Sequence, residues 1–284
     1  MRRRAEQAAI SRLAGKGRVE VCVIHPGALP VSCWRALADQ LAPETSACLL
    51  ELDAVAEYRD AALVSGPPAI SVDEIADRLC TDLELVGLSD TLTLVGWSFG
   101  GVIAYAMADR IPARVVLLDS VAPVGPFAQS NDSIATAVLL DWFAMYLGAR
   151  RGATLAIDVR ELRRPFDEAL AHVLRAGVAC GALRTDTPLA GLRKAYETYA
   201  AGLYRNNDLA RAYRAEPSAR PLMLLKASHS LLTEPWLGWD LLAEVQLMTV
   251  PGDHYTLLSD GLAFAPLARA LRHLTAAPPT SSDC

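Results

Sequence analysis

A serine flanked by glycines two residues away on either side is the clearest chemical feature of the sequence. Residues 96–100 read Gly-Trp-Ser-Phe-Gly, the pattern G-x-S-x-G, between one apolar segment and another. A nucleophilic serine on a sharp strand-to-helix turn has strained backbone geometry, and glycine at both flanking positions lets the chain pass close to itself. We therefore predict that Ser98 is a nucleophile. The plainer alternative is a solvated serine in a glycine-rich turn.

Such a serine needs a base, and this arrangement of motifs places the base after the serine and the acid in the chain. His254 stands in a loop directly after the last apolar run, within Pro-Gly-Asp-His-Tyr, where a base can reach over a sheet edge. A histidine in an ordinary surface loop is the alternative. The remaining histidines precede the serine, lie in helical patterns or follow an earlier strand: His25, His172, His229 and His273.

The acid that orients the base could follow either of two apolar runs. Asp119 closes the run that comes after the serine segment, and a carboxylate there is costly to bury unless it is paired. The run at 221–227 offers its first acids only at Glu234 and Asp240. We predict Asp119, with Asp240 as a relocated acid or a capping role for Asp119 as alternatives. Asp253 adjoins the base, but its side chain is expected to point to the other side of the loop.

Backbone amides are the expected donors to a developing oxyanion. The amide of Phe99 follows the serine at a predicted helix N-terminus, where the helix dipole favours negative charge. A second donor is expected from the loop after the first strand, which reads His-Pro-Gly-Ala-Leu over residues 25–29. Either Gly27 or Ala28 could supply it; a simple tight turn is the alternative.

Apolar runs alternate with segments of helical periodicity along most of the chain. Continuous apolar runs are typical of parallel strands covered by helices on both faces, and reacting groups then gather at the carboxyl ends of the strands. The predicted strands cover residues 19–25, 46–52, 92–95, 114–118, 221–227 and 245–250.

Helix signals fall between these runs. Ser32 offers an N-cap for a helix that continues to Leu41, and Ser71 with Glu74 predicts a capping box ahead of an apolar stripe. Further helices are predicted over residues 99–110 and 262–274.

The alternation stops between about Pro126 and Arg214, where helical segments follow one another without a strand. These segments cover residues 134–148, 165–176 and 189–204. We predict a single domain over residues 1–284, with a core of about 19–125 and 215–275, a helical lid insertion of about 126–214, and a disordered tail at 275–284. The first helical segment carries Trp142, Phe143 and Tyr146 in a nearly continuous apolar run. These side chains are candidates to bind substrate, with core packing as the alternative.

Composition excludes several other classes of protein. The chain has 284 residues, 52% of them hydrophobic, and a net charge of −5, so it can bury a large core and lacks the positive charge of a nucleic-acid binder. Its 6 cysteines show neither zinc-ligand nor disulfide spacing. The arginine-rich start lacks an apolar signal region, and glycines interrupt the uncharged stretch 91–108. A cytoplasmic protein without a membrane span or bound metal is expected.

Three motifs together resemble a known family, the thioesterase domains that end non-ribosomal peptide and polyketide synthases. They are Gly-Trp-Ser-Phe-Gly-Gly at 96–101 with Tyr105 after it, Leu-Leu-Asp-Ser at 117–120, and Pro-Gly-Asp-His-Tyr-Thr-Leu-Leu at 251–258. The resemblance implies an α/β-hydrolase fold with a mostly parallel central sheet, flanking helices and a helical lid. It also implies that Ser98 takes an acyl chain from the phosphopantetheine thiol of a carrier protein, with no metal or other cofactor.

The residues beside the serine refine this expectation. Trp97 and Phe99 are more similar to the chain-releasing members than to the stand-alone editing members, and Trp97 is a further candidate to contact substrate. Release by water or by cyclisation, and a discrete enzyme or an excised domain, are both compatible with the sequence. A carboxylesterase or lipase, and a catalytically silent binding protein of the same fold, are the alternative functions.

Overall fold

The computed structural model describes residues 10–62, 69–258 and 261–276. Of the tail predicted to be disordered, residues 277–284 lie outside the described residues, while 275 and 276 end the last helix. The arginine-rich residues 1–9 also lie outside them.

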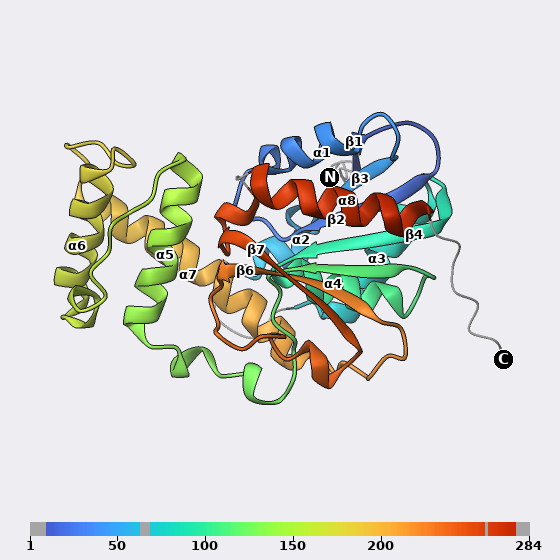
Figure 1. Cartoon of the computed structure of the whole chain (residues 1–284). Helices are drawn as coiled ribbons and strands as arrows, with labels where there is room; N and C mark the ends of the chain where they lie inside the picture. The colour runs from blue at the N-terminus through green and yellow to red at the C-terminus, as the bar shows by residue number, and fades with distance from the viewer. Residues whose placement is uncertain (1–9, 63–68, 259–260, 277–284) are drawn as a thin grey trace, which may run out of the picture.

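The strands of the described residues form one twisted sheet at the centre of the molecule (Figure 1). Its seven strands follow the order β1-β3-β2-β4-β5-β6-β7. Only β1 runs antiparallel to its neighbour, and all other neighbours are parallel. The strands are β1 (Ile10–Ala14), β2 (Val19–His25), β3 (Ala47–Glu51), β4 (Leu88–Trp97), β5 (Arg114–Leu118), β6 (Leu222–His229) and β7 (Val245–Asp253).

All six predicted strands are present, and two have the predicted bounds, 19–25 and 114–118. The strand β1 was not predicted from the sequence. Its short run Ile-Ser-Arg-Leu-Ala is partly exposed and obtains its hydrogen-bond partners from β3 at the edge of the sheet. An edge strand of this kind does not need the continuous apolar sequence of a buried parallel strand.

Helices cover both faces of the sheet (Figure 1). Alternate residues of β2 point to opposite faces, so that Val21 and Val23 join one apolar cluster while Cys22 and Ile24 join the other. Over the sheet, the first cluster includes residues of α1 (Arg35–Leu41) and α8 (Gly261–Ala276), and it continues into the helices between β5 and β6. The second includes residues of α2 (Ala56–Asp60), α3 (Val72–Glu84) and α4 (Phe99–Ala108).

The predicted N-cap at Ser32 is wrong. Residues Val31–Trp34 form a short 3-10 helix whose N-cap is Pro30, and α1 begins only at Arg35. The ring of Pro30 fixes its φ, here −69°, ahead of this turn, and Trp34, the last residue of the turn, is fully buried.

Three helices stand between β5 and β6: α5 (Thr136–Arg151), α6 (Phe166–Ala179) and α7 (Leu189–Ala212). They project beyond one end of the sheet, with α6 outermost and α7 running from α6 back towards the strands (Figure 1). The three helical segments predicted for this region are all present, and α7 continues to Ala212, well past the predicted end at residue 204.

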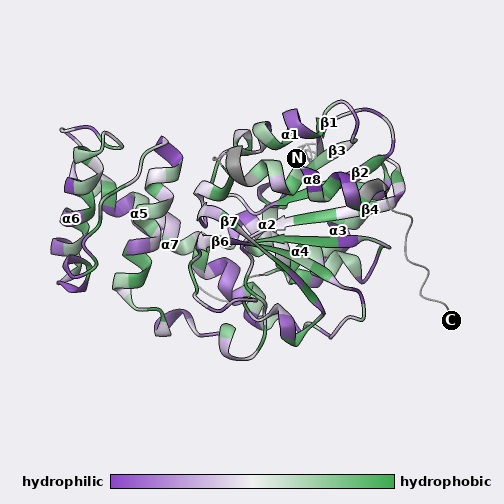
Figure 2. Ribbon diagram, in the orientation of Figure 1, coloured by the Kyte–Doolittle hydropathy of each residue, from purple (hydrophilic) through white to green (hydrophobic). Residues whose placement is uncertain are grey.

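Hydropathy follows this layered arrangement. The strands of the sheet are largely hydrophobic, and the hydrophilic residues gather on the surrounding helices and loops (Figure 2). Every residue of α4 is buried, so this helix lies inside the molecule rather than on its surface.

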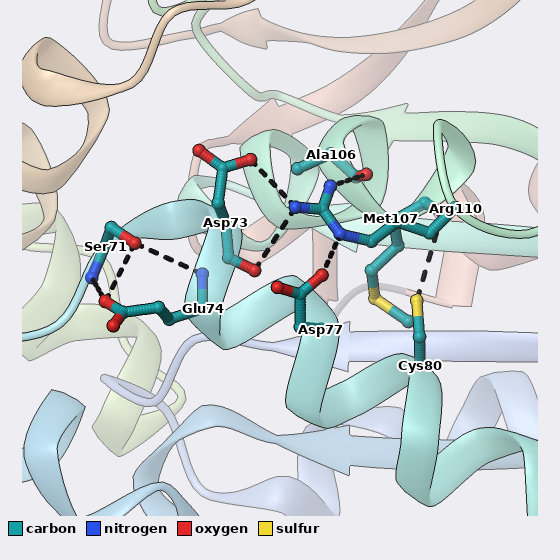
Figure 3. A network of polar contacts seen from close by, with 8 residues as sticks. All are labelled: Ser71, Asp73, Glu74, Asp77, Cys80, Ala106, Met107 and Arg110. Carbon is teal, nitrogen blue, oxygen red and sulfur yellow. Dashed lines mark hydrogen bonds and ion pairs between the residues drawn. The ribbon is translucent and has the colours of Figure 1, made fainter.

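Polar contacts join α4 to its neighbour α3 at the end remote from Ser98 (Figure 3). Arg110 pairs with Asp77 and, at 2.8 Å, with Asp73, and it donates to the carbonyl of Ala106 at 2.7 Å. The predicted capping box is confirmed at the start of α3, where the Ser71 amide donates to Glu74 at 2.8 Å and the Glu74 amide donates to Ser71 Oγ at 3.2 Å. The Arg110 contacts therefore tie α3 to the C-terminal end of α4, the helix that follows Ser98, whereas the capping box stabilises the start of α3 alone.

Candidate active site

Ser98 occupies the sharp turn between β4 and α4. Its backbone angles, φ 53° and ψ −127°, lie where residues other than glycine are strained. A Cβ atom on Gly96 would collide with the carbonyl of Gly100, and a Cβ on Gly100 would lie 2.5 Å from the carbonyl oxygen of Ile24. Glycine at both positions is therefore required by close backbone approach, as the G-x-S-x-G pattern predicted.

A continuous chain of hydrogen bonds joins Ser98, His254 and Asp119. The Ser98 hydroxyl lies 3.1 Å from His254 Nε2, and His254 Nδ1 lies 2.8 Å from Asp119 Oδ2. Because a carboxylate can only accept, Nδ1 carries the ring proton and Nε2 is free to accept the serine proton. This arrangement can raise the nucleophilicity of a serine and stabilise the imidazolium that forms.

The carboxylate of Asp119 is held from several directions. The residue follows β5 with φ 45°, its amide donates to the Leu225 carbonyl at 2.8 Å, and the residue as a whole is 1% exposed. Its Oδ1 accepts the amide of Ala227 at 2.9 Å. The buried charge thus has a partner for each oxygen, which offsets much of its desolvation cost.

The two competing acids are placed elsewhere. Asp240 is exposed in a turn between β6 and β7. Asp253 Oδ1 accepts the amides of Tyr255 and Thr256 at 2.8 and 2.9 Å, so it shapes the loop that carries His254. His254 Nδ1 pairs with Asp119 and not with this neighbouring carboxylate.

The amides expected to hold an oxyanion stand in two neighbouring segments. Phe99 is the first residue of α4, where amides have no acceptor within the helix. Gly27 and Ala28 follow β2 with φ of 89° and 66°, and β2 pairs directly with β4. Gly27 is buried and Ala28 exposed.

His25 is a buried structural residue at the base of that loop. The indole of Trp34 donates to its Nδ1 at 3.1 Å, so the proton stands on Nε2, which donates to the carbonyl of Leu29 at 2.9 Å. Burial lowers the pKa of His25, against smaller opposing effects of Leu29 and Asp53. The neutral ring therefore closes the turn of residues 26–29.

The aromatic residues predicted to contact substrate divide into two groups. Trp97 and Phe143 are 1% and 0% exposed, so neither presents a surface to substrate. The Trp97 indole donates to the backbone carbonyl of His254, and the Phe143 ring packs on Tyr199. Core packing therefore explains both, which corrects the prediction for these two side chains. Trp142 and Tyr146 are only partly buried and remain available to a ligand.

Aromatic rings connect the projecting helices with the histidine loop. The hydroxyls of Tyr199 in α7 and Tyr255 are 2.7 Å apart, and both rings lie against Tyr146 of α5. Tyr255 in turn meets the His254 ring edge-on at 4.9 Å between centroids. The helices α5 and α7 therefore contact the residue beside His254 directly.

The remaining histidines do not contact Ser98. His172 accepts the amide of Asp158 at the outer end of the projecting helices, His229 pairs with Ser228, and His273 is exposed on α8.

Neither a metal-binding cluster nor a membrane-spanning helix is present among the described residues. Over 10–62, 69–258 and 261–276, no three side chains of the types His, Cys, Asp and Glu gather closely enough to hold a metal ion. Within the same residues no helix combines the length and hydropathy needed to cross a membrane.

The mostly parallel sheet, the strained serine turn and the order serine, aspartate, histidine define the α/β-hydrolase fold. The family model "Thioesterase domain" matches residues 19–274. The chain therefore belongs to the thioesterase-domain family. No curated protein sequence matches it significantly.

Solved structures of the same fold come from biosynthetic systems. The four-domain nonribosomal peptide synthetase holo-AB3403 is 24% identical with a TM-score of 0.62 over 95% of this chain, which spans only 20% of the synthetase. YbtT, a type II thioesterase from the yersiniabactin pathway, is 16% identical with a TM-score of 0.57, over 95% of this chain and 100% of YbtT. The NocB thioesterase domain from the nocardicin cluster is 19% identical with a TM-score of 0.53, over 95% of this chain and 100% of that one.

Some residues that support the site were not identified from the sequence. The roles of the Trp97 indole and of His25 depend on partners that fold topology brings to them, so no local pattern marks them. For Asp253 a signal was present, because an aspartate often accepts amides two or three residues ahead of it in a turn.

Proposed function

We propose that the protein is a serine thioesterase that releases an acyl, peptidyl or polyketide chain from the phosphopantetheine thioester of a carrier protein. The observation that carries the proposal is the hydrogen-bonded chain from Ser98 through His254 to Asp119 in a member of the thioesterase-domain family. Structural neighbours that are synthetase domains or type II thioesterases support the choice of carrier-bound substrate.

In the proposed first half-reaction, His254 Nε2 removes the proton of the Ser98 hydroxyl while Oγ attacks the thioester carbonyl carbon. The imidazolium is stabilised by Asp119 and then gives its proton to the departing pantetheine thiolate. The C–S bond breaks, and the acyl chain remains as an ester on Ser98.

In the second half-reaction, a water molecule or a nucleophile within the acyl chain gives its proton to His254 and attacks the ester. The proton then returns to Ser98 Oγ as the C–O bond breaks. Water gives a free acid and an internal nucleophile gives a ring. In both half-reactions the amides of Phe99 and of Gly27 or Ala28 would hold the oxyanion. Every step uses groups of the chain, the substrate and, for hydrolysis, one water molecule, and needs no metal or other cofactor.

Intact-protein mass spectrometry after exposure to a synthetic acyl-pantetheine tests this function. The expected result is a mass increase of one acyl group, located on the peptide that contains Ser98. The matched variant Ser98→Ala should fold as the parent does and gain no mass. An adduct on another residue, for example Cys33 or Cys180, would overturn the assignment.

The substrate class is tested by comparing acyl-pantetheine with p-nitrophenyl esters of the same acyl group. A thioesterase is expected to show the higher kcat/KM on the thioester. Preference for the oxygen ester would instead indicate a carboxylesterase, and failure to react with a fluorophosphonate would indicate a silent binding protein.

A further inference from the structure

Tyr58 has an unusual number of polar contacts for a fully buried side chain. It lies in the short helix α2 with 0% of its surface exposed. Its hydroxyl lies 2.9 Å from the carbonyl of Pro26, 2.8 Å from Asn206 Oδ1 and 2.6 Å from Arg205 Nη2. Pro26 begins the turn after β2, whereas Arg205 and Asn206 belong to α7.

The chemistry of these partners decides the direction of each bond. A guanidinium can only donate, so the Tyr58 oxygen accepts from Arg205. The carbonyl of Pro26 and Asn206 Oδ1 can both only accept, so they share the single hydroxyl proton of Tyr58. Asn206 Oδ1 has another donor, because Arg205 Nε lies 3.1 Å from it. Burial raises the pKa of the Tyr58 phenol, although Arg205 lowers it, so the hydroxyl keeps the proton that it donates.

Arg205 is held firmly in this arrangement. Its guanidinium carbon lies 3.6 Å from the centroid of the Tyr58 ring, and its Nη1 donates to the Tyr58 backbone carbonyl at 3.2 Å. A cation over an aromatic face adds attraction to the hydrogen bonds. The Arg205 side chain of α7 therefore contacts Tyr58 at three places: the Tyr58 ring, the Tyr58 hydroxyl and the Tyr58 backbone carbonyl.

The ring of Tyr58 also contacts Phe99, the residue that follows Ser98. It stacks on the ring of Phe99, with centroids 6.0 Å apart and planes 2° from parallel. The candidate oxyanion amides belong to Phe99, at the start of α4, and to the turn of residues 26–29. A single phenol therefore touches both segments and the helix α7, which runs back to the sheet from the projecting helices (Figure 1).

We infer that Tyr58 is a positioning residue, which fixes the turn of residues 26–29 beside Phe99 and links it through Arg205 to α7. It does not touch the reacting atoms. Because Arg205 of α7 donates to the same hydroxyl that donates to the Pro26 carbonyl, a displacement of α7 is expected to weaken the contact between Tyr58 and the turn. The inference deepens the proposed function and rests on it only for its effect on catalysis.

Hydrogen–deuterium exchange of the full chain tests the link without reference to activity. Tyr58→Phe removes only the hydroxyl, and Arg205→Gln removes the donors to it. Both variants should accelerate exchange of the amides of residues 27–29 by ~10-fold, on the scale of losing one buried hydrogen bond. The double variant should accelerate it no further than Tyr58→Phe alone.

Tyr105→Phe is the matched control. This tyrosine is buried too, and its hydroxyl donates to the carbonyl of Glu216 at 2.7 Å, away from the turn. If Tyr58→Phe and Arg205→Gln change exchange at residues 27–29 no more than this control does, the inference is overturned. Should Tyr58→Phe fail to fold, Arg205→Gln alone decides, because Arg205 lies only partly buried.

Kinetics on an acyl-pantetheine then give a second readout. Tyr58→Phe should lower kcat by ~10-fold, less than the ~10²–10³-fold cost of deleting an oxyanion donor outright, and change KM by less than ~2-fold. A larger effect on KM than on kcat contradicts the positioning role. Inactivity of the parent protein on every acyl thioester would refute the proposed function, while the exchange measurement would still decide the role of Tyr58.

Discussion

The indole of Trp97 donates a 3.0 Å hydrogen bond to the backbone carbonyl of His254, 157 residues further along the chain. Trp97 is the last residue of β4 and immediately precedes Ser98, so one side chain joins the serine turn to the histidine loop. The Trp97 ring also stacks on His25, with centroids 6.0 Å apart. Trp97, the residue beside the nucleophile, thus holds the backbone of His254 in place.

Trp97→Phe should remove the hydrogen bond to the His254 carbonyl while keeping an aromatic ring in place. The buried carbonyl of His254 would lose its donor, which costs about 1–3 kcal/mol of unfolding free energy. We expect that loss in urea titrations, together with a fall in kcat that exceeds any rise in KM.

Trp239→Phe is the comparison for this variant. Trp239 is also fully buried, and its indole donates to the carbonyl of Ser120 at 2.8 Å. A similar loss of stability is expected there with a smaller loss of kcat. Equal losses of kcat in the two variants would mean that Trp97 serves packing alone.

Asp119→Asn should lower kcat by several orders of magnitude without unfolding the protein. The amide would favour the wrong tautomer of His254, and the same replacement in a serine protease lowers kcat ~10⁴-fold. Steady-state kinetics and circular dichroism measure the two quantities.

Two other aspartates serve as controls for Asp119. Asp240→Asn changes an exposed carboxylate and should leave kcat nearly unchanged. Asp253→Asn weakens the turn that carries His254, so an intermediate effect is expected. A larger loss in Asp240→Asn than in Asp119→Asn would show that the acid follows β6 instead of β5.

The neutral form of His25 makes stability depend on pH. Burial lowers the folded-state pKa of His25 below the value near 6.5 of the unfolded chain, so the unfolded state binds the proton more readily. This contribution is complete above pH ~6.5 and is lost as pH falls towards the folded-state pKa. Protonation of His25 would also break its hydrogen bond with Trp34, because Nδ1 would then carry a proton and face another donor, the Trp34 indole N–H.

Thermal melts between pH 7 and pH 5 measure this effect. The melting temperature of the parent should fall more steeply below pH ~6.5 than that of His25→Gln, which cannot titrate there. Parallel curves for the two proteins would show that His25 does not titrate differently on unfolding. His273→Gln, at an exposed position on α8, should leave the slope of the parent unchanged.

The sequence predicted best what depends on local pattern. Strand ends locate Asp119 and His254 because an apolar run that stops at a polar residue marks the edge of a parallel sheet. The glycines around Ser98 identify the turn because only glycine allows its backbone contacts.

Features that depend on contacts between residues far apart in the chain could not be predicted from local sequence patterns. Tyr58 and Arg205 are 147 residues apart, and no local sequence pattern marks the two as contact partners. Phe143 and Trp142 are adjacent in one apolar run, yet only Phe143 is fully buried. A helix that is apolar around most of its circumference carries no periodic signal to separate the two.

Because Trp142 and Phe143 differ in burial, their replacement by alanine should have different effects. Phe143 is fully enclosed in α5 and packs on Tyr196 and Tyr199, with ring centroids 5.5 Å away in both cases. Phe143→Ala should therefore create a cavity, cost about 3–5 kcal/mol of unfolding free energy and lower activity on short and long acyl thioesters alike. Trp142 is partly exposed on the same helix, so Trp142→Ala should cost less stability and change chain preference, seen as a larger fall in kcat/KM on a long acyl-pantetheine than on acetyl-pantetheine. Equal falls on the two substrates in Trp142→Ala, with a loss of stability like that of Phe143→Ala, would place Trp142 in the structural core and the acyl chain elsewhere.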